Sequence, residues 1–333
     1  MNIKKRLRFI FGVDLGGTTV KIGLFATGGE FITKWEIETD TFDAGAHILS
    51  DIANSIQDCV RKAQIDPGDI VGIGMGIPGP VRPDGTCPGC ANLGWGETDV
   101  KGELKCLTGF KTLVANDANV AAMGEYIKYH SDIKNLALVT IGTGVGAGFV
   151  LKGRPLYGSV GAAAEIGHMV VNPGETAACA CGGKGHLEQY ASATGLVRTA
   201  NRLMAEGDLE TVLKAGFSAK DVFDAAREGD ELSVAAVDQL GKYLGIALAN
   251  IAVTINPEKI VLGGGISNAG DILTDVVSKH FKNFVFPACA DTRIELARLG
   301  NDAGIYGGYA LVSGKIKGTH KNHCKIQGTH KNH

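Results

Sequence analysis

The sequence has no long apolar run and no excess of charge of either sign. Its 33 basic and 35 acidic side chains give a formal net charge of −2, so neither nucleic acid nor an anionic membrane is expected as a partner. A membrane-spanning helix, which needs about 18 or more consecutive apolar residues, is not expected either. The basic residues 1–8 lead into a strand-like run and not into a hydrophobic signal segment. The expected location is therefore the cytoplasm.

Glycine and cysteine, by contrast, are well represented. The chain has 333 residues, enough for two domains, and 48 of them are glycine, about twice the usual share. The glycines cluster in loops after apolar runs, where phosphate-binding turns occur. The eight cysteines of a cytoplasmic protein are expected to be reduced or bound to metal.

Hydrophobic periodicity predicts alternating strands and helices, which is the pattern of an α/β protein. Residues 81–110 are rich in Gly, Pro and Cys and are expected to be irregular. In the first part of the chain, strands are expected at 8–15, 20–25, 31–38, 70–77 and 111–115, and helices at 46–63 and 118–129. In the second part, strands are expected at 136–141, 147–151, 260–262 and 293–299, and helices within 195–251, from about 270 and over 302–312.

The strand–turn–strand units at 9–25 and 136–151 both place Gly and Thr in the turn. This similarity predicts an internal duplication of two related α/β domains. The last residues form a tandem repeat, because 317–323 recurs almost unchanged as 327–333. This polar, basic segment is expected to be a disordered extension, with a weak metal site through its histidines as the alternative.

Three glycine-rich turns, which follow apolar strands, indicate a nucleotide site. They lie at 14–19, 140–146 and 262–267. Backbone N–H groups in such turns can point at phosphate oxygens, and Asp14 would tolerate the phosphates only with a cation such as Mg²⁺ between them. No turn fits GxxxxGK[ST], and no GxGxxG opens a helix, so neither a Walker-type loop nor a dinucleotide fold is indicated.

Four soft metal ligands lie close together in sequence: His168, Cys179, Cys181 and His186. Thiolates and imidazoles in this number suit a closed tetrahedral zinc site, whose role would be structural. Such a site would hold in place the two carboxylates that bracket it, Glu165 and Glu188. The alternative is a cysteine-containing loop without metal, because the spacing is not that of the common zinc ribbon.

Asn116 and Asp117 follow a predicted strand near the junction of the two parts of the chain. A carboxylate that faces a cleft there can accept the proton of a hydroxyl that attacks a phosphoryl group. The alternative is a helix cap, since Asn and Asp are favoured at that position. The local sequence does not decide between them.

The motifs 14–18, 92–95, 116–119, 165–168 and 179–188 occur in the order found in the ROK family of sugar kinases and repressors. The chain resembles that family over residues 8–313, and its bacterial glucokinases most closely. The resemblance implies the actin-like, hexokinase-like (ribonuclease H-like) fold, with two α/β domains about a central cleft, and a homodimer. The expected domains are residues 1–116, joined by the helix at 302–314, and residues 117–301, with 315–333 as a tail.

The resemblance also implies roles for individual residues, with Asp117 as the base that deprotonates the sugar 6-hydroxyl. The residues expected to bind the sugar are Asn92, Asn116, Asp117, Glu165, His168 and Glu188. Those expected to bind the nucleotide are Asp14, Gly16, Gly17, Thr18, Thr19, Lys21, Gly142, Thr143, Gly144, Gly263, Gly264 and Gly265. Structural Zn²⁺ is expected on His168, Cys179, Cys181 and His186.

The chain departs from the family pattern at three places. His186 stands where the family usually has a third cysteine, and Ala164 stands where a glycine usually precedes the Glu. Cys87 and Cys90 form an unusual loop before Asn92, which is expected to be a plain loop and not a redox-active disulfide.

The expected function is phosphorylation of a hexose with ATP and Mg²⁺, most simply of D-glucose at O6. An N-acylhexosamine kinase, acting on N-acetylmannosamine or N-acetylglucosamine, is the nearest alternative. A sugar-responsive repressor is a distant one, because it would need a helix-turn-helix of about 70 residues before the first glycine turn, where only thirteen residues precede Asp14. The presence of Asp117, the expected base, also favours an enzyme over a repressor.

Overall fold

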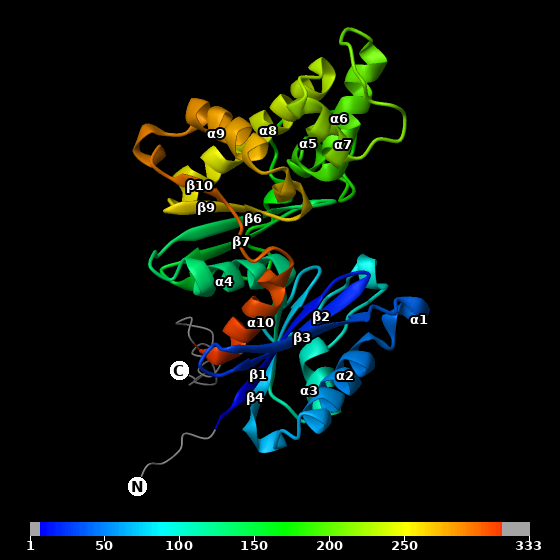
Figure 1. Cartoon of the computed structure of the whole chain (residues 1–333), viewed down its shortest axis with the longest axis vertical. Coiled ribbons are helices and arrows are strands. Elements are labelled where there is room, and N and C mark those ends of the chain that lie inside the picture. The colour runs from blue at the N-terminus through cyan, green and yellow to red at the C-terminus, as the bar shows by residue number, and fades with distance from the viewer. Residues whose placement is uncertain (1–6, 315–333) are drawn as a thin grey trace, which may run out of the picture.

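The computed structural model describes residues 7–314, so the repeated segment at 317–333 and its expected disorder lie outside the described residues. Two five-stranded sheets lie one above the other along the length of the molecule (Figure 1). Two helices, α4 (Asp117–Tyr129) and α10 (Ala303–Ser313), lie between them. None of the helices in the described range combines the length and apolar character that a membrane span requires.

The first sheet has the strand order β3-β2-β1-β4-β5. Strand β2 runs antiparallel to β1 and β3, whereas β4 and β5 run parallel to β1. The pairing of β1 with β2 sets Asp14 opposite Lys21. The strands are β1 Phe9–Leu15, β2 Thr19–Ala26, β3 Phe31–Glu38, β4 Ile70–Ile77 and β5 Thr112–Asn116.

Helices α2 (Ile48–Lys62) and α3 (Val100–Thr108) cover the outer face of this sheet, and the short α1 (Phe42–Gly45) lies at its end. Helix α2 confirms the predicted amphipathic helix, and its apolar stripe is buried on the sheet. Helix α3 corrects the expectation that residues 81–110 are irregular. Its ends are defined by Asp99, whose carboxylate accepts a hydrogen bond from the Gly102 N–H, and by the left-handed Gly109.

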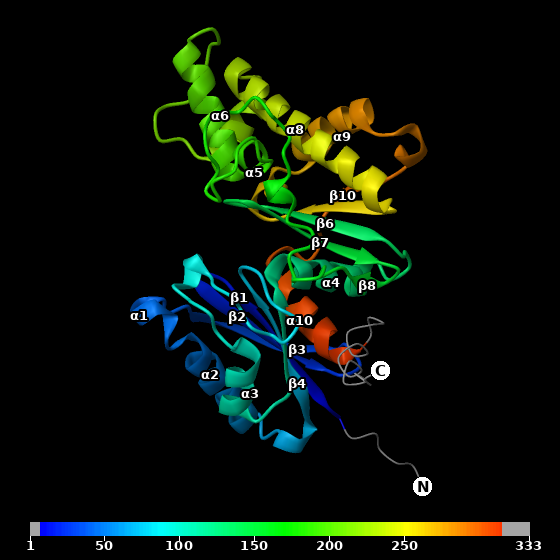
Figure 2. The ribbon, with the colours of Figure 1, turned by 180° about the vertical axis from the view of Figure 1, so that it is seen from behind.

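The second sheet has the order β10-β9-β6-β7-β8, and five helices cover its outer face (Figure 2). The strands are β6 Leu136–Ile141, β7 Val145–Leu151, β8 Arg154–Pro155, β9 Lys259–Gly263 and β10 Arg293–Leu296. The helices are α5 Glu188–Ala191, α6 Ala193–Glu206, α7 Ala219–Arg227, α8 Glu231–Ile255 and α9 Asp271–Phe284. The inner side of α8 is buried in the largest apolar cluster.

The two sheets share one topology. In each, a central strand pairs with an antiparallel strand across a glycine turn, a further antiparallel strand lies outside that, and two parallel strands lie on the other side. Strands β1 and β6 are the equivalent central strands. The duplication predicted from the two strand–turn–strand units is therefore confirmed at the level of topology.

Close backbone contacts join the two central helices to each other and α10 to the first sheet. A β carbon on Gly307 would collide with the carbonyl of Val120, and one on Gly124 would collide with that of Ala303. Only glycine allows backbones to approach so closely. Five glycines form these contacts, which we call the glycine seam: Gly12, Gly74, Gly124, Gly307 and Gly308.

Within the described range the chain crosses from one sheet to the other twice. The first passage runs through α4, which starts at the end of β5 and leads to β6. The second runs from β10 to α10 through residues 297–302, here called the crossover segment. Both passages therefore lie beside the space between the sheets.

Candidate active site

The three glycine turns lie at the carboxyl ends of β1, β6 and β9, as predicted. In the first turn, the Gly16 N–H donates to the Thr19 carbonyl at 3.0 Å. In the second, the Gly142 N–H donates to the Gly144 carbonyl at 2.9 Å. In the third, Gly264 has a φ of 80° and lies so close to the backbone of Ile141 that a side chain would collide with it.

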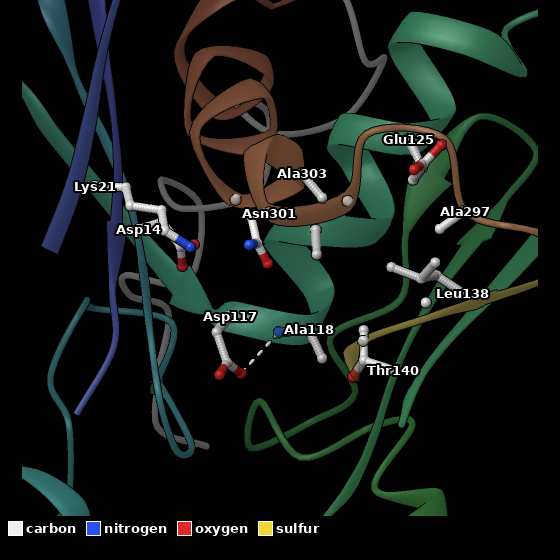
Figure 3. Close-up of a pocket in the computed structure, with 15 residues that line it drawn as sticks. Asp14, Lys21, Asp117, Ala118, Glu125, Leu138, Thr140, Ala297, Asn301 and Ala303 are labelled. Carbon is white, nitrogen blue, oxygen red and sulfur yellow. Dashed lines mark hydrogen bonds between the residues drawn. The ribbon is translucent and has the colours of Figure 1, made fainter. Parts of the chain in front are cut away.

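A cavity of about 210 Å³ lies between the sheets beside these turns (Figure 3). Residues predicted to bind nucleotide form part of its wall: Asp14, Lys21, Gly263 and Gly264. The other predicted nucleotide residues are not part of that wall: Gly16, Gly17, Thr18, Thr19, Gly142, Thr143, Gly144 and Gly265. The first and third turns thus contribute to one cavity, while the second contributes only its first residue, Thr140.

Asn116, and not Asp117, occupies the N-cap position of α4. Its side-chain oxygen accepts from the Asn119 N–H at 3.2 Å, and its amide donates to the Gly79 carbonyl at 3.1 Å. The helix-cap role, which was the alternative for Asp117, therefore belongs to Asn116. Asn116 is buried, and these bonds occupy both its amide oxygen and its amide nitrogen. A sugar hydroxyl could therefore bind Asn116 only by sharing one of these two atoms.

Asp117 is the first residue of α4, and its carboxylate faces the cavity (Figure 3). It accepts a hydrogen bond from the Ala118 N–H at 2.7 Å. Burial raises the pKa of Asp117 to about 6, the Ala118 hydrogen bond opposes this, and the nearby carboxylates of Asp14 and Glu165 raise it further. The group is thus ionised at neutral pH but more basic than an ordinary aspartate.

Asp14 and Lys21 enter the cavity from the first sheet (Figure 3). Burial raises the pKa of Asp14, and the ammonium group of Lys21 partly offsets this. The carboxyl group of Asp14 lies so close to Gly304, in the first turn of α10, that a β carbon there would collide with it. Three carboxylate residues, Asp14, Asp117 and Glu125, therefore line a cavity with one lysine, an arrangement that favours a cation.

The remaining predicted sugar ligands surround Asp117 unevenly. Exposed Asn92 lies beside the first glycine turn, next to Gly17. Glu165 and His168 are exposed at the two ends of the short 3₁₀ turn Ile166–His168. Glu188 is half-buried, and its carboxylate accepts from the Val145 N–H at 3.1 Å, so it lies against the second glycine turn.

Ala164 adopts a left-handed backbone conformation, with a φ of 68°. Such a conformation is strained for a residue with a β carbon and explains why glycine suits this position. The strain lies directly before Glu165, one of the carboxylates close enough to influence Asp117.

The four predicted metal ligands come together. One ligand atom from each of His168, Cys179, Cys181 and His186 can be chosen so that all lie within 4.8 Å of one another. The Sγ atom of Cys181 lies 3.3 Å from Nδ1 of His186. A β carbon on Gly183 would collide with the His186 ring, so this glycine makes room for the imidazole that replaces the usual thiolate.

Cys87 and Cys90 are unbonded and buried. Their backbones pair with those of Thr98 and Trp95, which closes the loop that carries Asn92. The pair therefore shapes the loop through its backbone, as expected for a plain loop.

Three residues with polar side chains in the cavity wall were not among the predicted site residues: Glu125, Thr140 and Asn301. Glu125 alone had a detectable signal, because it is a charged residue among the buried residues of α4. Asn301 belongs to the crossover segment, which no motif marked.

Two sheets of the same topology, with paired carboxylates in a cavity between them, define the actin-like, hexokinase-like fold. A model of the ROK family matches residues 10–315. The chain therefore belongs to the ROK family.

Relatives within the family differ in activity. The chain is 42% identical to the glucokinase of Halalkalibacterium halodurans over 328 residues, which is 95% of this chain and 98% of that protein. The structure of a ROK family glucokinase from Streptomyces griseus, in complex with glucose and AMPPNP, matches with a TM-score of 0.74 and 28% identity, covering 92% of this chain and 99% of that one.

A ROK family transcriptional regulator, a homologue of the E. coli MLC protein, matches with a TM-score of 0.82 and 29% identity. That match covers 92% of this chain and 77% of the regulator. Because the fold is common to kinases and regulators, the function has to be argued from the site.

Proposed function

We propose that the chain transfers the γ-phosphoryl group of ATP to O6 of D-glucose. The observation that carries this proposal is the Asp117 carboxylate, which faces the cavity between the sheets and has its pKa raised to about 6. As the 6-hydroxyl oxygen forms a bond to the γ-phosphorus, the bond from that phosphorus to the β,γ-bridging oxygen breaks. Asp117 takes the hydroxyl proton, and the products are glucose 6-phosphate and ADP.

The glycine turns would bind the phosphates through their backbone N–H groups. Residues 16–19 with Lys21, and residues 142–144, would approach the phosphates, while residues 263–265 would lie by the adenosine. Asp14 would hold the Mg²⁺ that accompanies ATP, directly or through water, and this ion supplies charge neutralisation. The proximity of Asp14 to Lys21 and Asp117 supports this assignment.

Polar side chains around Asp117 would bind the sugar hydroxyls: Asn92, Asn116, Glu165, His168 and Glu188. None of these five residues is part of the cavity wall, and closure of the two sheets would bring them around the sugar. Closure would also exclude water, which would otherwise accept the phosphoryl group. For this motion we propose two domains, residues 1–116 with 302–314 and residues 117–301, which correspond to the two sheets.

His168, Cys179, Cys181 and His186 would hold a structural Zn²⁺. The fit is supported by the donor set and by the ligand atoms, which lie within 4.8 Å of one another. Tetrahedral zinc needs separations of about 3.3–3.8 Å between its ligand atoms, so small side-chain movements suffice. Two thiolates and two imidazoles would give a neutral site. Zinc there would fix the loop that leads into Glu188 and would orient His168 toward the sugar.

The proposal also includes a homodimer in the cytoplasm, which rests on the family resemblance alone. Light scattering of the purified protein at several concentrations tests the dimer directly. A mass that stays that of one chain would contradict it.

A coupled assay of ADP release tests the function. We expect release that depends on sugar, fastest with glucose and slower with mannose, N-acetylglucosamine and N-acetylmannosamine, above a blank without sugar. Preference for an N-acetylated sugar would replace glucose by an N-acylhexosamine as the substrate. Release of no ADP with any sugar would refute the kinase assignment and favour a sugar-responsive regulator.

A further inference from the structure

Glu125 is a buried carboxylate with no part in the mechanism above. Its side chain is fully buried on α4. One oxygen, Oε1, accepts from two backbone N–H groups of the crossover segment, that of Arg298 at 2.7 Å and that of Leu299 at 2.6 Å. Burying a carboxylate is unfavourable unless it is hydrogen-bonded, and these two N–H groups of the crossover segment offset that cost.

The other oxygen of Glu125, Oε2, has no hydrogen-bond donor among residues 7–314. The nearest ionisable group is Nε2 of buried His130, at 4.0 Å. Burial and the neighbouring Lys259 lower the pKa of His130, so its imidazole is neutral. Glu125 is thus held by the crossover segment and not by an ion pair.

The crossover segment has no fully buried residue; Ala297 at its start packs against an apolar cluster, and polar contacts hold the rest. It depends on polar anchors at three places. The Ala297 N–H donates to the Leu262 carbonyl of β9 at 2.8 Å, and Asp302 forms an ion pair with Lys34 of β3 at 2.6 Å. Between these ends, Glu125 holds two consecutive backbone N–H groups, so it controls the middle of the segment.

The crossover segment forms part of the cavity wall through Ala297, Gly300 and Asn301, which flank the two anchored N–H groups, and Glu125 lines the same cavity (Figure 3). Gly263 and Gly264 of the third glycine turn line the same cavity, and a β carbon on Gly263 would lie 3.2 Å from that of Ala297. A second contact reinforces the anchor, because the Arg298 guanidinium lies 4.3 Å from the ring centre of Tyr129, also on α4.

We propose that Glu125 is a positioning residue for the nucleotide, which sets the crossover wall against the nucleoside end of ATP. The inference rests on the proposed use of ATP. Asp117 and Glu125 lie on one helix, eight residues or about 12 Å apart along its axis. Helix α4 therefore positions both the base, Asp117, and, through Glu125, the crossover segment that lines the cavity.

Glu125→Ala and Glu125→Gln test the proposal, with Glu258→Ala as the matched control. Glu258 also accepts from two consecutive backbone N–H groups, those of Lys134 and Asn135, but it lies outside the cavity wall. Glu125→Ala should raise the KM for ATP by about tenfold or more and leave the KM for glucose within about twofold. Glu258→Ala should lower stability and change neither constant.

Direct calorimetry of MgATP binding without sugar separates this inference from the proposed function. Binding to the wild type that weakens in Glu125→Ala supports the inference. Equal binding by both proteins overturns it, and so does an equal loss of affinity for ATP and glucose, which would indicate general damage to α4. No binding by the wild type would refute the use of ATP itself. If Glu125→Ala does not fold, Glu125→Gln, which loses the charge but keeps one acceptor, carries the same test with an expected loss of about threefold.

Discussion

The substitution Asp117→Asn separates a catalytic base from a structural residue. It keeps the shape of the side chain and an oxygen that can accept the hydrogen bond from the Ala118 N–H. It removes the negative charge and the ability to take a proton. A base should therefore lose turnover while the helix start remains intact.

The size of the stability change follows from the pKa of Asp117, which burial raises from 3.8 to about 6. At about 1.4 kcal/mol per pKa unit, the ionised carboxylate costs about 3 kcal/mol of folding free energy at neutral pH. This shift already includes the opposing effect of the hydrogen bonds from Ala118 and Asn116. Asp117→Asn, which is neutral, should thus raise the free energy of unfolding at pH 7 by about 2 to 3 kcal/mol.

The sign of the pH dependence is fixed by the same shift. Because the folded-state pKa is the higher one, the folded chain binds more protons than the unfolded chain between about pH 4 and pH 6. The free energy of unfolding of the wild type should therefore fall as the pH rises through that window. Asp117→Asn should not show this fall. In the wild type kcat/KM should fall about tenfold per pH unit below about pH 6, where the base becomes protonated.

Urea unfolding at about pH 4 and pH 7, together with the ADP-release assay, measures both effects. Turnover of Asp117→Asn should fall by about a hundredfold or more while glucose still binds. Asp99→Asn is the matched control, since it changes an aspartate at the start of α3, outside the cavity, and asparagine also caps helices. A variant at position 117 that is less stable at pH 7 and keeps more than half of the wild-type rate would refute the reasoning.

Three further changes test the rest of the site. Asp14→Ala should raise the KM for MgATP by about tenfold or more and leave glucose binding without ATP unchanged; equal losses for both ligands would indicate a folding role. In a chain cut after Ser313, which removes the histidine-rich tail, elemental analysis should find about one zinc per chain, and Cys181→Ala should lose the metal and raise the KM for glucose. A fully active truncated chain without zinc would disprove the metal site. Ala164→Gly should raise the free energy of unfolding by about 1 kcal/mol by relieving the left-handed backbone, and unchanged or lower stability in urea would show that the strain is absent.

Local patterns predicted most of the elements, because their cause is local. The apolar runs that predicted buried strands and the apolar stripe of α2 are properties of short segments, and the structure confirms both. Helix α3 was missed because its nine residues lie in a stretch dominated by Gly, Pro and Cys. Its cap, Asp99, and its terminal Gly109 were visible but were not weighed against that composition.

The site was only partly predictable, for a different physical reason. Asp14, Lys21 and Asp117 follow strands or belong to them, so strand ends placed them correctly at one cavity. Glu125 and Asn301 reach that cavity from segments 176 residues apart, and their meeting depends on how α4 and the crossover segment pack. No periodic pattern in the sequence indicates that these two residues lie close together.

Glycine was interpreted mainly as a turn former, and for the glycine seam this interpretation fails. Gly124 and Gly307 lie within helices, where a turn former is out of place, and serve as contact surfaces. A seam without side chains would also restrict the sheet closure proposed above. Backbones in such close contact cannot slide without their carbonyl groups colliding, yet they can rotate about the line of contact. For that closure the glycine seam would act as a pivot, and its positions should tolerate substitution less than most of the cavity wall, although none of them has a side chain that could touch a ligand.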